Sequence, residues 1–318
     1  MSALLKVEDW KCYFPVKSGL WQRTKSYLKA VNGVHLKVAA GEIVSIVGES
    51  GCGKSTLGNS LLGLVKPTGG RLWLNGTLID REKVSAWKPF RRDFQIIFQD
   101  PYSSLNPRHT VFEILSEPLL HYRLCSKKDA KVKSIELLEK VGLSADYIDR
   151  FPHAFSGGQR QRLGIARILG LKPKLIICDE IVSALDVSVQ AQIIQLLLKL
   201  KKEYDLSLIF IAHDLSLVKA ISDRVYVMYL GKIVEWGGQE LFTHPKHPYT
   251  QSLIQSIPTL DRSKRPVPLQ GEVPSLSQLP KGCSFYGRCP NKLEKCKESE
   301  PSIVSGKEPY SCFNPLES

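Results

Sequence analysis

The stretch Glu42–Thr56, EIVSIVGESGCGKST, most constrains how this chain can fold. Its mostly apolar residues Ile43–Val47 predict a buried strand, and a helix-like segment follows at Thr56–Leu64. A strand, a glycine-rich loop and a helix in this order form a phosphate-binding loop. Glycines let such a loop adopt positive φ angles and approach a phosphate closely, which a Cβ would obstruct.

The residues of this loop predict a phosphate site. Main-chain N–H groups that point inward would form an anion nest, and the helix N-terminus adds a partial positive charge of about +0.5. Lys54 would place its charge on the β- and γ-phosphates, and the Ser55 hydroxyl would hold Mg²⁺. The alternative, an accidental glycine-rich turn, is disfavoured by the flanking strand and helix. The predicted phosphate-binding residues are Gly48, Glu49, Ser50, Gly51, Cys52, Gly53, Lys54, Ser55 and Thr56.

Length and composition set broad limits. A chain of 318 residues suggests two domains, or one large domain with an appendage, and a hydrophobic fraction of 43% permits a full core. No apolar run approaches the ~18–20 residues of a membrane helix, and the N-terminus lacks the pattern of a signal peptide, so we expect a cytoplasmic protein. The net charge of +13 suits an anionic ligand, an anionic membrane surface or nucleic acid, and does not choose between them.

Strands and helices alternate along much of the chain. Strands are predicted at Leu4–Val16, Ala30–Val38, Phe94–Phe98, Leu175–Cys178, Leu206–Ala212 and Arg224–Met228. Gly69–Ile79 predicts a hairpin with its turn at Asn75-Gly76, and Gln159–Leu169 predicts a helix. This alternation predicts an α/β fold whose mostly parallel sheet is covered on both faces. Thr110–Phe155 looks helical and interrupts the pattern, so we expect an inserted helical subdomain at about residues 110–170.

Two acids end one of the predicted strands. Leu175–Cys178 is followed directly by Asp179 and Glu180. Acids at a strand end are most often a solvated cap, but beside a phosphate loop they divide the chemistry between them. Asp179 can hold Mg²⁺, directly or through water. Glu180 can orient and polarise an attacking water, a general-base role worth roughly 10²–10⁴ in rate.

A second anion-seeking helix start lies at Ser156-Gly157-Gly158-Gln159. A serine followed by two glycines, directly before a helix, presents main-chain N–H groups at a helix N-terminus. The chain has two such termini but one phosphate loop, so the second is expected to serve a nucleotide held by another subunit. Taken alone, the motif would be an ordinary N-cap.

The motifs follow one another as GESGCGKST, Gln99, FSGGQ, LIICDE, Ser183–Asp186 and His213. This order resembles the nucleotide-binding subunits of ATP-binding-cassette (ABC) transporters, and SGGQ between the two Walker motifs is highly specific. The resemblance covers nearly the whole chain. It implies a P-loop NTPase core of the ABC ATPase type, with a mostly parallel sheet, an antiparallel β part and a helical subdomain. It also implies ATP and Mg²⁺ as cofactors.

The resemblance implies roles for single residues around the ATP of this chain. Phe14 would stack on adenine; Tyr13 beside it is a rival, and a buried strand residue is the alternative. Gln99 would touch Mg²⁺ or the water and relay to the membrane subunits. His213 would hold the γ-phosphate, with Glu180 as the catalytic base.

The resemblance places a second set of residues against a partner subunit. Ser156–Gln159 would close on the partner's ATP, and Asp186 would communicate across the dimer. There are departures from the family pattern. Ile181 and Val182 stand where the family usually has proline and then threonine or valine, and Phe155 stands where leucine is commoner. None of these changes removes a donor, acceptor or charge, so we expect hydrolytic competence.

Three longer stretches resemble the dipeptide and oligopeptide importer ATPases more closely. They are FQDPYSSLNPR at Phe98–Arg108, SALDVSVQAQ at Ser183–Gln192 and HPYTQSL at His247–Leu253, in a layout most similar to the F-type subunit. These importers, by resemblance, use two different ATPases, two membrane permeases and an external peptide-binding protein. The resemblance thus implies a heterodimer with a paralogous ATPase at the cytoplasmic face of the membrane, and no nucleic-acid partner.

The tail carries half of the chain's eight cysteines. A composition break near Pro258 predicts a nucleotide-binding domain at residues 1–257 and a C-terminal extension at 258–318 that begins as a linker. The extension ends in a short cysteine-bearing module, Cys283–Cys312. A module below about 40 residues usually needs a metal or disulfide staple, and a reducing cytoplasm argues against disulfides. The clustered cysteines are Cys283, Cys289, Cys296 and Cys312.

These four thiols could bind zinc or an iron–sulfur cluster. The spacings of five, six and fifteen intervening residues fit neither a usual zinc knuckle nor the ferredoxin runs, so spacing alone does not identify the metal. The corresponding tail of the peptide-importer ATPases resembles this one and carries a 4Fe-4S cluster in characterised members. The resemblance therefore favours 4Fe-4S, with zinc second and four free thiols third.

Together, these observations predict an ATP-hydrolysing subunit that energises import of dipeptides or oligopeptides through a membrane ABC transporter. One alternative is a soluble ABC ATPase that acts on nucleic acid or ribosomes. Another is an importer ATPase for nickel, haem or cell-wall peptides. A third hypothesis makes the cysteine cluster a redox or metal sensor of an otherwise standard ATPase.

Overall fold

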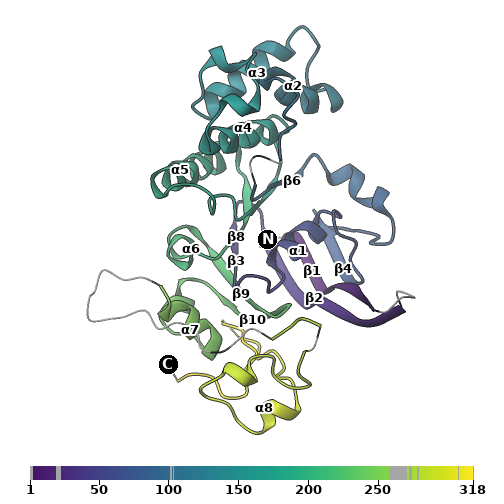
Figure 1. The fold of residues 1–318 in the computed structure, drawn as a ribbon, viewed down its shortest axis with the longest axis vertical. Coiled ribbons are helices and arrows are strands. Elements are labelled where there is room, and N and C mark those ends of the chain that lie inside the picture. The colour runs from purple at the N-terminus through teal and green to yellow at the C-terminus, as the bar shows by residue number, and fades with distance from the viewer. Residues whose placement is uncertain are drawn as a thin grey trace. The chain divides into compact units, whose positions relative to one another are not determined.

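The computed structural model describes residues 3–18, 23–100, 102, 104–257, 271, 274–277, 279–306 and 308–317. The chain forms two compact units that do not follow its linear order. The first unit combines Met1–Ala39, Ile43–Ala86 and Phe210–Ser318, and the second combines Ala40–Glu42 and Trp87–Ile209. Figure 1 labels the elements of each unit. The predicted division between residues 257 and 258 groups the chain differently and stays a prediction.

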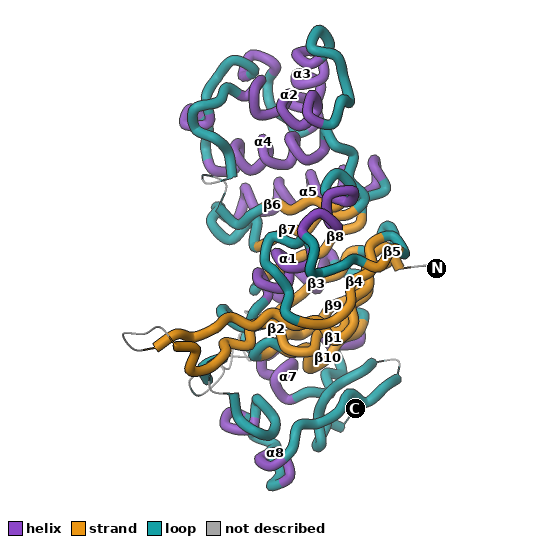
Figure 2. Tube along the Cα trace, turned by 90° about the vertical axis from the view of Figure 1, so that its right-hand side faces the viewer, coloured by secondary structure: helices purple, strands orange, loops and turns teal. Residues whose placement is uncertain are grey.

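A four-stranded antiparallel sheet in the order β2-β1-β4-β5 forms one part of the first unit. Its strands are β1 (Ala3–Ser18), β2 (Arg23–Ala39), β4 (Gly69–Leu74) and β5 (Thr77–Leu78). In Figure 2, β1 and β2 are long strands, drawn in orange. Leu5, Val7 and Trp10 of β1 are buried, and the Trp10 indole Nε1 donates to Ser60 Oγ of α1 at 2.9 Å. This buried hydrogen bond ties the sheet to the helix that follows the phosphate loop.

The predicted hairpin lies between β4 and β5. Asn75 has φ +49° and Gly76 has φ +78°. A type I′ turn requires positive φ at both central residues, which asparagine and glycine tolerate best. The structure therefore confirms the turn that the Asn-Gly pair predicted.

A second sheet of the first unit is built around β9, which pairs in parallel with β3 and antiparallel with β10. All five residues of β3 are buried, as expected for a strand covered on both faces. The elements of this part are β3 (Ile43–Val47), α1 (Lys54–Leu61), α6 (Leu215–Ile221), β9 (Arg224–Tyr229), β10 (Lys232–Gly237) and α7 (Pro248–Gln255).

Residues 279–317, here called the C-terminal module, are tied to β10. The Trp236 N–H donates to the Pro309 carbonyl at 3.1 Å, and the Ser311 N–H donates to the Val234 carbonyl at 2.8 Å. The module contains a 3₁₀ turn at Tyr286–Arg288 and a short helix, α8 (Lys295–Glu298). It thus continues the hydrogen bonding of the sheet beyond β10.

Among its described residues, the second unit contains a parallel pair of strands and four α-helices. Its elements are β6 (Phe94–Ile97), α2 (Val111–His121), α3 (Ala130–Lys140), α4 (Gly157–Leu169), β7 (Leu175–Asp179) and α5 (Val187–Tyr204). Strand β8 (Ser207–Ala212) contains one of the chain's boundaries between the two units, the one between Ile209 and Phe210. Leu115, Leu138 and Leu163 are buried where α2, α3 and α4 pack together. These helices and two 3₁₀ turns confirm the predicted helical character of the segment from Thr110 to Phe155.

Both glycine-rich helix starts lie two residues earlier than predicted. α1 begins at Lys54 rather than at Thr56, and α4 begins at Gly157 rather than at Gln159. Serine and glycine are poor helix formers, so propensity places a helix start after them. The loop before α1 and the serine cap before α4 override that preference. The predicted linker after Pro258 lies outside the described residues up to residue 270.

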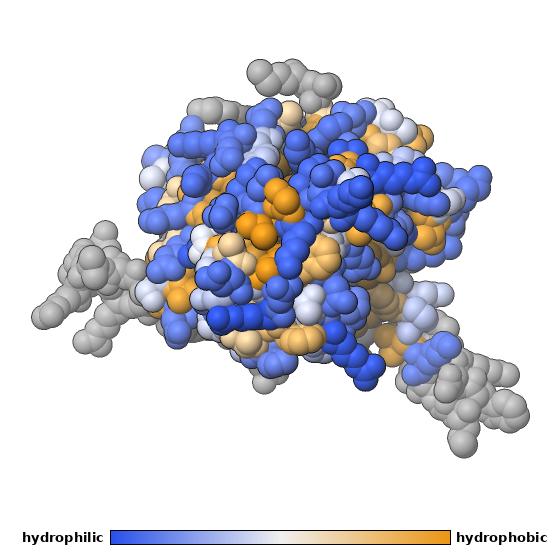
Figure 3. Space-filling view, turned by 90° about the horizontal axis from the view of Figure 1, so that it is seen from above, coloured by the Kyte–Doolittle hydropathy of each residue, from blue (hydrophilic) through white to orange (hydrophobic). Residues whose placement is uncertain are grey.

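Within the described ranges, no helix is both long and apolar enough to cross a membrane. Figure 3 shows mostly hydrophilic side chains on the face that it presents, with hydrophobic ones in small groups between them.

His247 is the N-cap residue of α7 and supplies a pH-dependent part of the fold's stability. Its Nδ1 accepts the Tyr249 N–H at 3.0 Å, and the side chain is buried. Burial lowers the pKa of His247 from 6.5 to about 3. The unfolded chain therefore binds more protons than the folded one between these values, and stability is lost as the pH falls from 6.5.

We predict that lowering the pH from 7 to 5 reduces the free energy of unfolding by up to about 2 kcal/mol through this residue. His247→Asn keeps an N-cap oxygen but cannot titrate, so its stability should fall less over the same range. Urea unfolding of both proteins at the two pH values measures the difference. Equal losses in the two proteins would contradict the assignment to His247.

Candidate functional site

The phosphate-binding loop connects β3 to α1 through two crowded glycines. Gly48 has φ +153°, and a Cβ there would lie 2.1 Å from the Met228 carbonyl oxygen. Gly53 has φ +108°, and its Cβ would lie 1.9 Å from the Ala30 carbonyl oxygen. Both positions exclude any side chain, so the structure confirms the steric reason for these glycines.

Lys54 lies folded against this loop. Its Nζ donates to the carbonyls of Gly48 at 2.8 Å and of Glu49 at 3.0 Å, and the residue is only 4% exposed. The ammonium group is therefore held against the main chain of the loop. Ser55 and Thr56 follow in the first turn of α1, as the phosphate-site prediction requires.

The remaining loop residues differ in exposure. Ser50 and Gly51 are exposed, whereas Cys52 is buried. Burial raises the pKa of the Cys52 thiol. This cysteine is therefore a neutral packing residue beneath the loop, and its main chain rather than its sulfur remains the predicted phosphate contact.

The adenine-stacking prediction can be compared with the exposure of two neighbouring rings. The Tyr13 hydroxyl donates to Asn32 Oδ1 at 2.5 Å, and Lys29 lies over its ring. Phe14 is 40% exposed, so the alternative of a buried strand residue is wrong. Phe14 is the more accessible of the pair and stays the predicted stacking residue.

His213 lies between β8 and α6 in the first unit and is exposed. Asp214 caps α6 by accepting the N–H groups of Ser216 and Leu217 at 2.8 and 3.3 Å. The cap fixes the backbone next to His213 at the end of a strand. Its γ-phosphate role stays a prediction.

The second unit brings Gln99 and Glu180 together. Asp179 is the last residue of β7 and is 5% exposed, and Glu180 follows with φ +46°. Gln99 Nε2 donates to Glu180 Oε2 at 3.0 Å, and Ser183 Oγ donates to the Glu180 carbonyl at 2.8 Å. A non-glycine residue at positive φ costs energy and is typical of functional sites. The side chain and the main chain of Glu180 are thus both fixed.

The SGGQ segment begins α4 with a reciprocal cap. The Gln159 N–H donates to Ser156 Oγ at 3.4 Å, and the Ser156 N–H donates to Gln159 Oε1 at 3.0 Å. Ser156 is exposed, as a residue that contacts a partner's nucleotide must be. The ordinary N-cap and the phosphate-contacting interpretation therefore describe the same helix start. Asp186, also exposed, is the N-cap residue of α5.

Two links between α4 and the segment after Gln99 were not predicted from the sequence. The Arg160 guanidinium lies 4.0 Å from the ring centroid of Tyr102, and Arg167 Nη1 donates to the Ser104 carbonyl at 2.8 Å. Arg160 and Arg167 are seven residues apart on one helix, and this spacing was the available signal. These contacts join the segment after Gln99 to the helix that begins with SGGQ.

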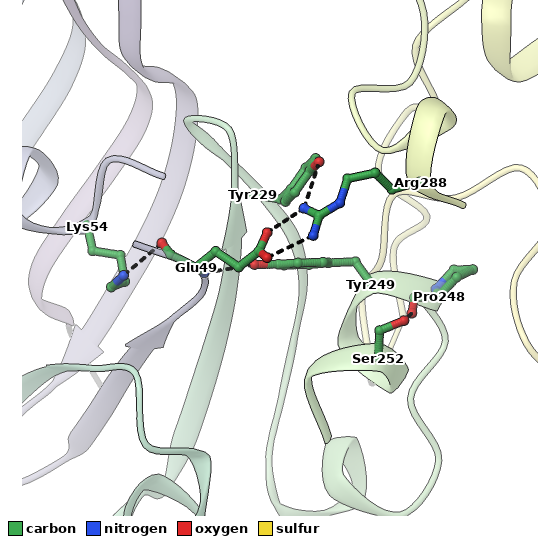
Figure 4. Close-up of polar contacts among 7 residues, drawn as sticks. All are labelled: Glu49, Lys54, Tyr229, Pro248, Tyr249, Ser252 and Arg288. Atoms are coloured by element: carbon green, nitrogen blue, oxygen red, sulfur yellow. Dashed lines mark hydrogen bonds and ion pairs between the residues drawn. The ribbon is translucent and has the colours of Figure 1, made fainter. Parts of the chain in front are cut away.

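Two more residues without a predicted role contact the phosphate loop. Figure 4 shows Tyr249 and Arg288 directed at Glu49. Arg288 Nη1 and Nη2 lie 2.6 and 2.9 Å from the two carboxylate oxygens of Glu49. Tyr249 lies in the HPYTQSL stretch that the family resemblance marked, whereas Arg288 had no signal beyond its place between two cysteines.

The four clustered cysteines lie in the C-terminal module. Burial is the main reason that the pKa of Cys283 is raised to about 11. The neighbouring thiols of Cys296, Cys312 and Cys289 raise it further. Burial also raises the pKa values of Cys289 and Cys312. Over the part of the chain that the structure describes, no three His, Cys, Asp or Glu side chains form a group that could hold a metal ion. The four predicted ligand thiols are thus neighbours, and the 4Fe-4S cluster stays a prediction.

A substitution in SGGQ tests the packing of α4 on α5. A Cβ at Gly158 would lie 2.5 Å from Val189 Cγ1, and overpacking of this kind typically costs about 1–3 kcal/mol. We predict that Gly158→Ala lowers the free energy of unfolding by this amount. Val189→Ala removes the opposing methyl groups, so the double variant should be more stable than the sum of the single effects predicts. Additive losses in urea unfolding would contradict this packing.

Two family models match the chain. One, described as ABC transporter, matches residues 31–183, and one described as oligopeptide/dipeptide transporter, C-terminal region, matches residues 234–296. The oligopeptide transport ATP-binding protein OppF of Salmonella typhimurium is 50% identical over 94% of this chain and 92% of its own length. AppF of Bacillus subtilis, also an oligopeptide transport ATP-binding protein, is 48% identical over 94% and 93%. The dipeptide transport ATP-binding protein DppF of Escherichia coli is 45% identical over 98% and 94%.

Solved structures agree with these relatives. The structure of cbiO1 from Clostridium perfringens, part of the ABC transporter complex cbiONQ, has a TM-score of 0.65 at 28% identity and covers 76% of this chain and 92% of that one. The dimeric ATP-binding cassette MJ0796 bound to ADP and Pi has a TM-score of 0.65 at 29% identity and covers 74% and 98%. The predicted α/β fold of the ABC ATPases is therefore confirmed. This chain belongs to the ABC transporter family, in the group of oligopeptide and dipeptide transport ATP-binding proteins.

Proposed function

We propose that this chain is the ATP-hydrolysing subunit that energises import of dipeptides or oligopeptides through a membrane ABC transporter. The observation that carries this proposal is the 45–50% identity, over 94–98% of the chain, to proteins named for oligopeptide and dipeptide transport. The loop between strand β3 and helix α1, whose carbonyls hold the Lys54 side chain, supplies the nucleotide site that such a subunit needs.

ATP would bind to the first unit through main-chain and side-chain groups. The N–H groups of the loop and the N-terminus of α1 face the negative phosphates, and Lys54 adds a full positive charge. The exposed ring of Phe14 offers adenine a stacking surface. His213 is proposed as a further contact to the γ-phosphate.

The hydrolytic step would rely on Glu180. Its carboxylate takes a proton from the attacking water, and the amide of Gln99, at 3.0 Å from that carboxylate, holds it in orientation. Ser55, Asp179 and Gln99 are the proposed Mg²⁺ ligands, and their hydroxyl, carboxylate and amide oxygens are of the kind that this ion prefers. When bound, Mg²⁺ neutralises charge on the phosphates.

The partners follow from the same family. We propose that a paralogous ATPase completes a heterodimer, and that two permease subunits follow the closure of this heterodimer around ATP. An extracytoplasmic protein would deliver the peptide. Ser156–Gln159 would contact the ATP of the paralogue, and Asp186 would lie at the dimer interface. The chain would then sit peripherally at the cytoplasmic face of the membrane.

Replacing Glu180 by glutamine tests the catalytic step. We predict that Glu180→Gln lowers ATP turnover at least 10²-fold, because the amide cannot accept the proton, while ATP binding stays close to wild type. Steady-state ATPase assays and nucleotide titration measure the two quantities. Glu203→Gln, at an exposed glutamate of α5, is the matched control and should leave both unchanged. Near-normal hydrolysis by Glu180→Gln would remove Glu180 from this role.

For the cysteine cluster we propose a 4Fe-4S centre, on the strength of four neighbouring thiols in one small module and of the family resemblance. The expected result is iron and acid-labile sulfide in equal amounts in the full chain purified without oxygen. Cys296→Ser should lose this content, and Cys125→Ser, in the other unit, should keep it. Stoichiometric zinc, or four titratable thiols and no metal, would contradict the proposal.

A further inference from the structure

The side chain of Arg288 reaches from the C-terminal module to the start of the phosphate loop. Both of its terminal nitrogens contact the Glu49 carboxylate, at 2.6 and 2.9 Å (Figure 4). The Arg288 side chain is 4% exposed and that of Glu49 22%. A bidentate pair of this kind fixes direction as well as distance, and its low exposure limits screening by salt.

Other groups of Glu49 are held at the same time. Its N–H donates to the buried hydroxyl of Tyr249 at 2.9 Å, and its carbonyl accepts from Lys54 Nζ at 3.0 Å. The amide, the carbonyl and the carboxylate of one loop residue therefore each have a partner. Glu49 thus contacts both Arg288, through its carboxylate, and Lys54, through its carbonyl.

An aromatic cluster connects the module to the same place. The ring of Phe285 lies 5.4 Å from that of Tyr249 and 5.3 Å from that of Tyr229, and Tyr229 and Tyr249 are 4.5 Å apart. Arg288 Nη1 also lies 3.4 Å from the Tyr229 hydroxyl oxygen. The guanidinium is therefore positioned by packing before any nucleotide arrives.

The backbone around Arg288 is fixed by the cysteine segment. The Cys283 N–H donates to the Cys296 carbonyl at 2.7 Å, and the Tyr286 N–H donates to the Cys283 carbonyl at 3.0 Å. These bonds hold the 3₁₀ turn that ends at Arg288. The cysteine segment thus sets where the guanidinium lies.

The charge of Glu49 gives this contact a role. A carboxylate in a loop that must accept a triphosphate repels the ligand, because like charges at short range raise the free energy of binding. An arginine that pairs with the carboxylate cancels this repulsion. It also keeps Glu49, and with it the carbonyl that Lys54 contacts, in one place.

We propose that Arg288 is a positioning residue for ATP, through which the C-terminal module raises the affinity of the phosphate loop for nucleotide. The inference rests on the proposed assignment of this loop as the ATP site. It adds to that assignment a residue outside the ATPase motifs, and it gives the module an influence on nucleotide binding.

The test is ATP titration of the full chain, followed by steady-state kinetics. Arg288→Met leaves Glu49 unpaired and should weaken ATP binding about tenfold, within the usual range for coupled sites, and raise KM while kcat at saturating ATP stays close to wild type. Glu49→Gln removes the repulsive charge, so Glu49→Gln/Arg288→Met should regain most of the lost affinity. Recovery of this kind would not follow if Arg288 served only to keep the module folded.

Lys232→Met is the matched control. Lys232 of β10 pairs with Glu300 of the C-terminal module, so this variant removes an ion pair between the same two parts without touching the loop. ATP affinity should stay at the wild-type value. An equal loss in Lys232→Met and Arg288→Met, or wild-type affinity in Arg288→Met, would overturn the proposal.

Two further variants separate the possible failures. If Lys54→Ala binds ATP normally, the assignment of the nucleotide site itself is wrong. If Lys54→Ala loses ATP and Arg288→Met does not, the site stands and the role of Arg288 is refuted. Should Arg288→Met unfold, the reversed pair Glu49→Arg/Arg288→Glu restores the ion pair, and nucleotide affinity well above that of Glu49→Arg alone is then the supporting result.

Discussion

The phosphate loop depends on two close approaches of main chain to main chain. Gly48 lies against the Met228 carbonyl of β9 and Gly53 against the Ala30 carbonyl of β2, with no room for a Cβ at either place. These contacts come from two different sheets of the first unit. Because both ends of the loop are fixed, its N–H groups can be aimed before a ligand binds, and little conformational entropy remains to be lost on binding.

The parts of the fold with local signals could be predicted from the sequence. The buried strand Ile43–Val47 and the turn at Asn75-Gly76 occur where predicted, because apolar runs and positive-φ residues determine structure over a few positions. The ends of elements were less certain. β1 and β2 extend beyond their predicted bounds because they pair with each other, and a partner strand cannot be read from one segment.

The candidate site was predictable as a set of motifs and not as a set of contacts. Sequence placed Gln99 and Glu180 in one mechanism, and the structure adds the hydrogen bond between them. Arg288 and Glu49 are 239 positions apart in the sequence. Neither the periodicity of helices and strands nor the spacing within a motif relates residues at such a separation. The four cysteines of the C-terminal module form a conspicuous cluster in the sequence. Such a cluster does not by itself define the coordination geometry of its side chains.

The hydrogen bonds between the C-terminal module and β10 also cover the outer edge of the sheet, where another chain could otherwise pair with it. In the first unit β10 is the outer strand beside β9, and such a strand offers unpaired N–H and C=O groups to any other chain. Residues near Pro309 and Ser311 occupy these groups. A product truncated before them would expose a ready template for intermolecular β-pairing, so the tail guards against aggregation.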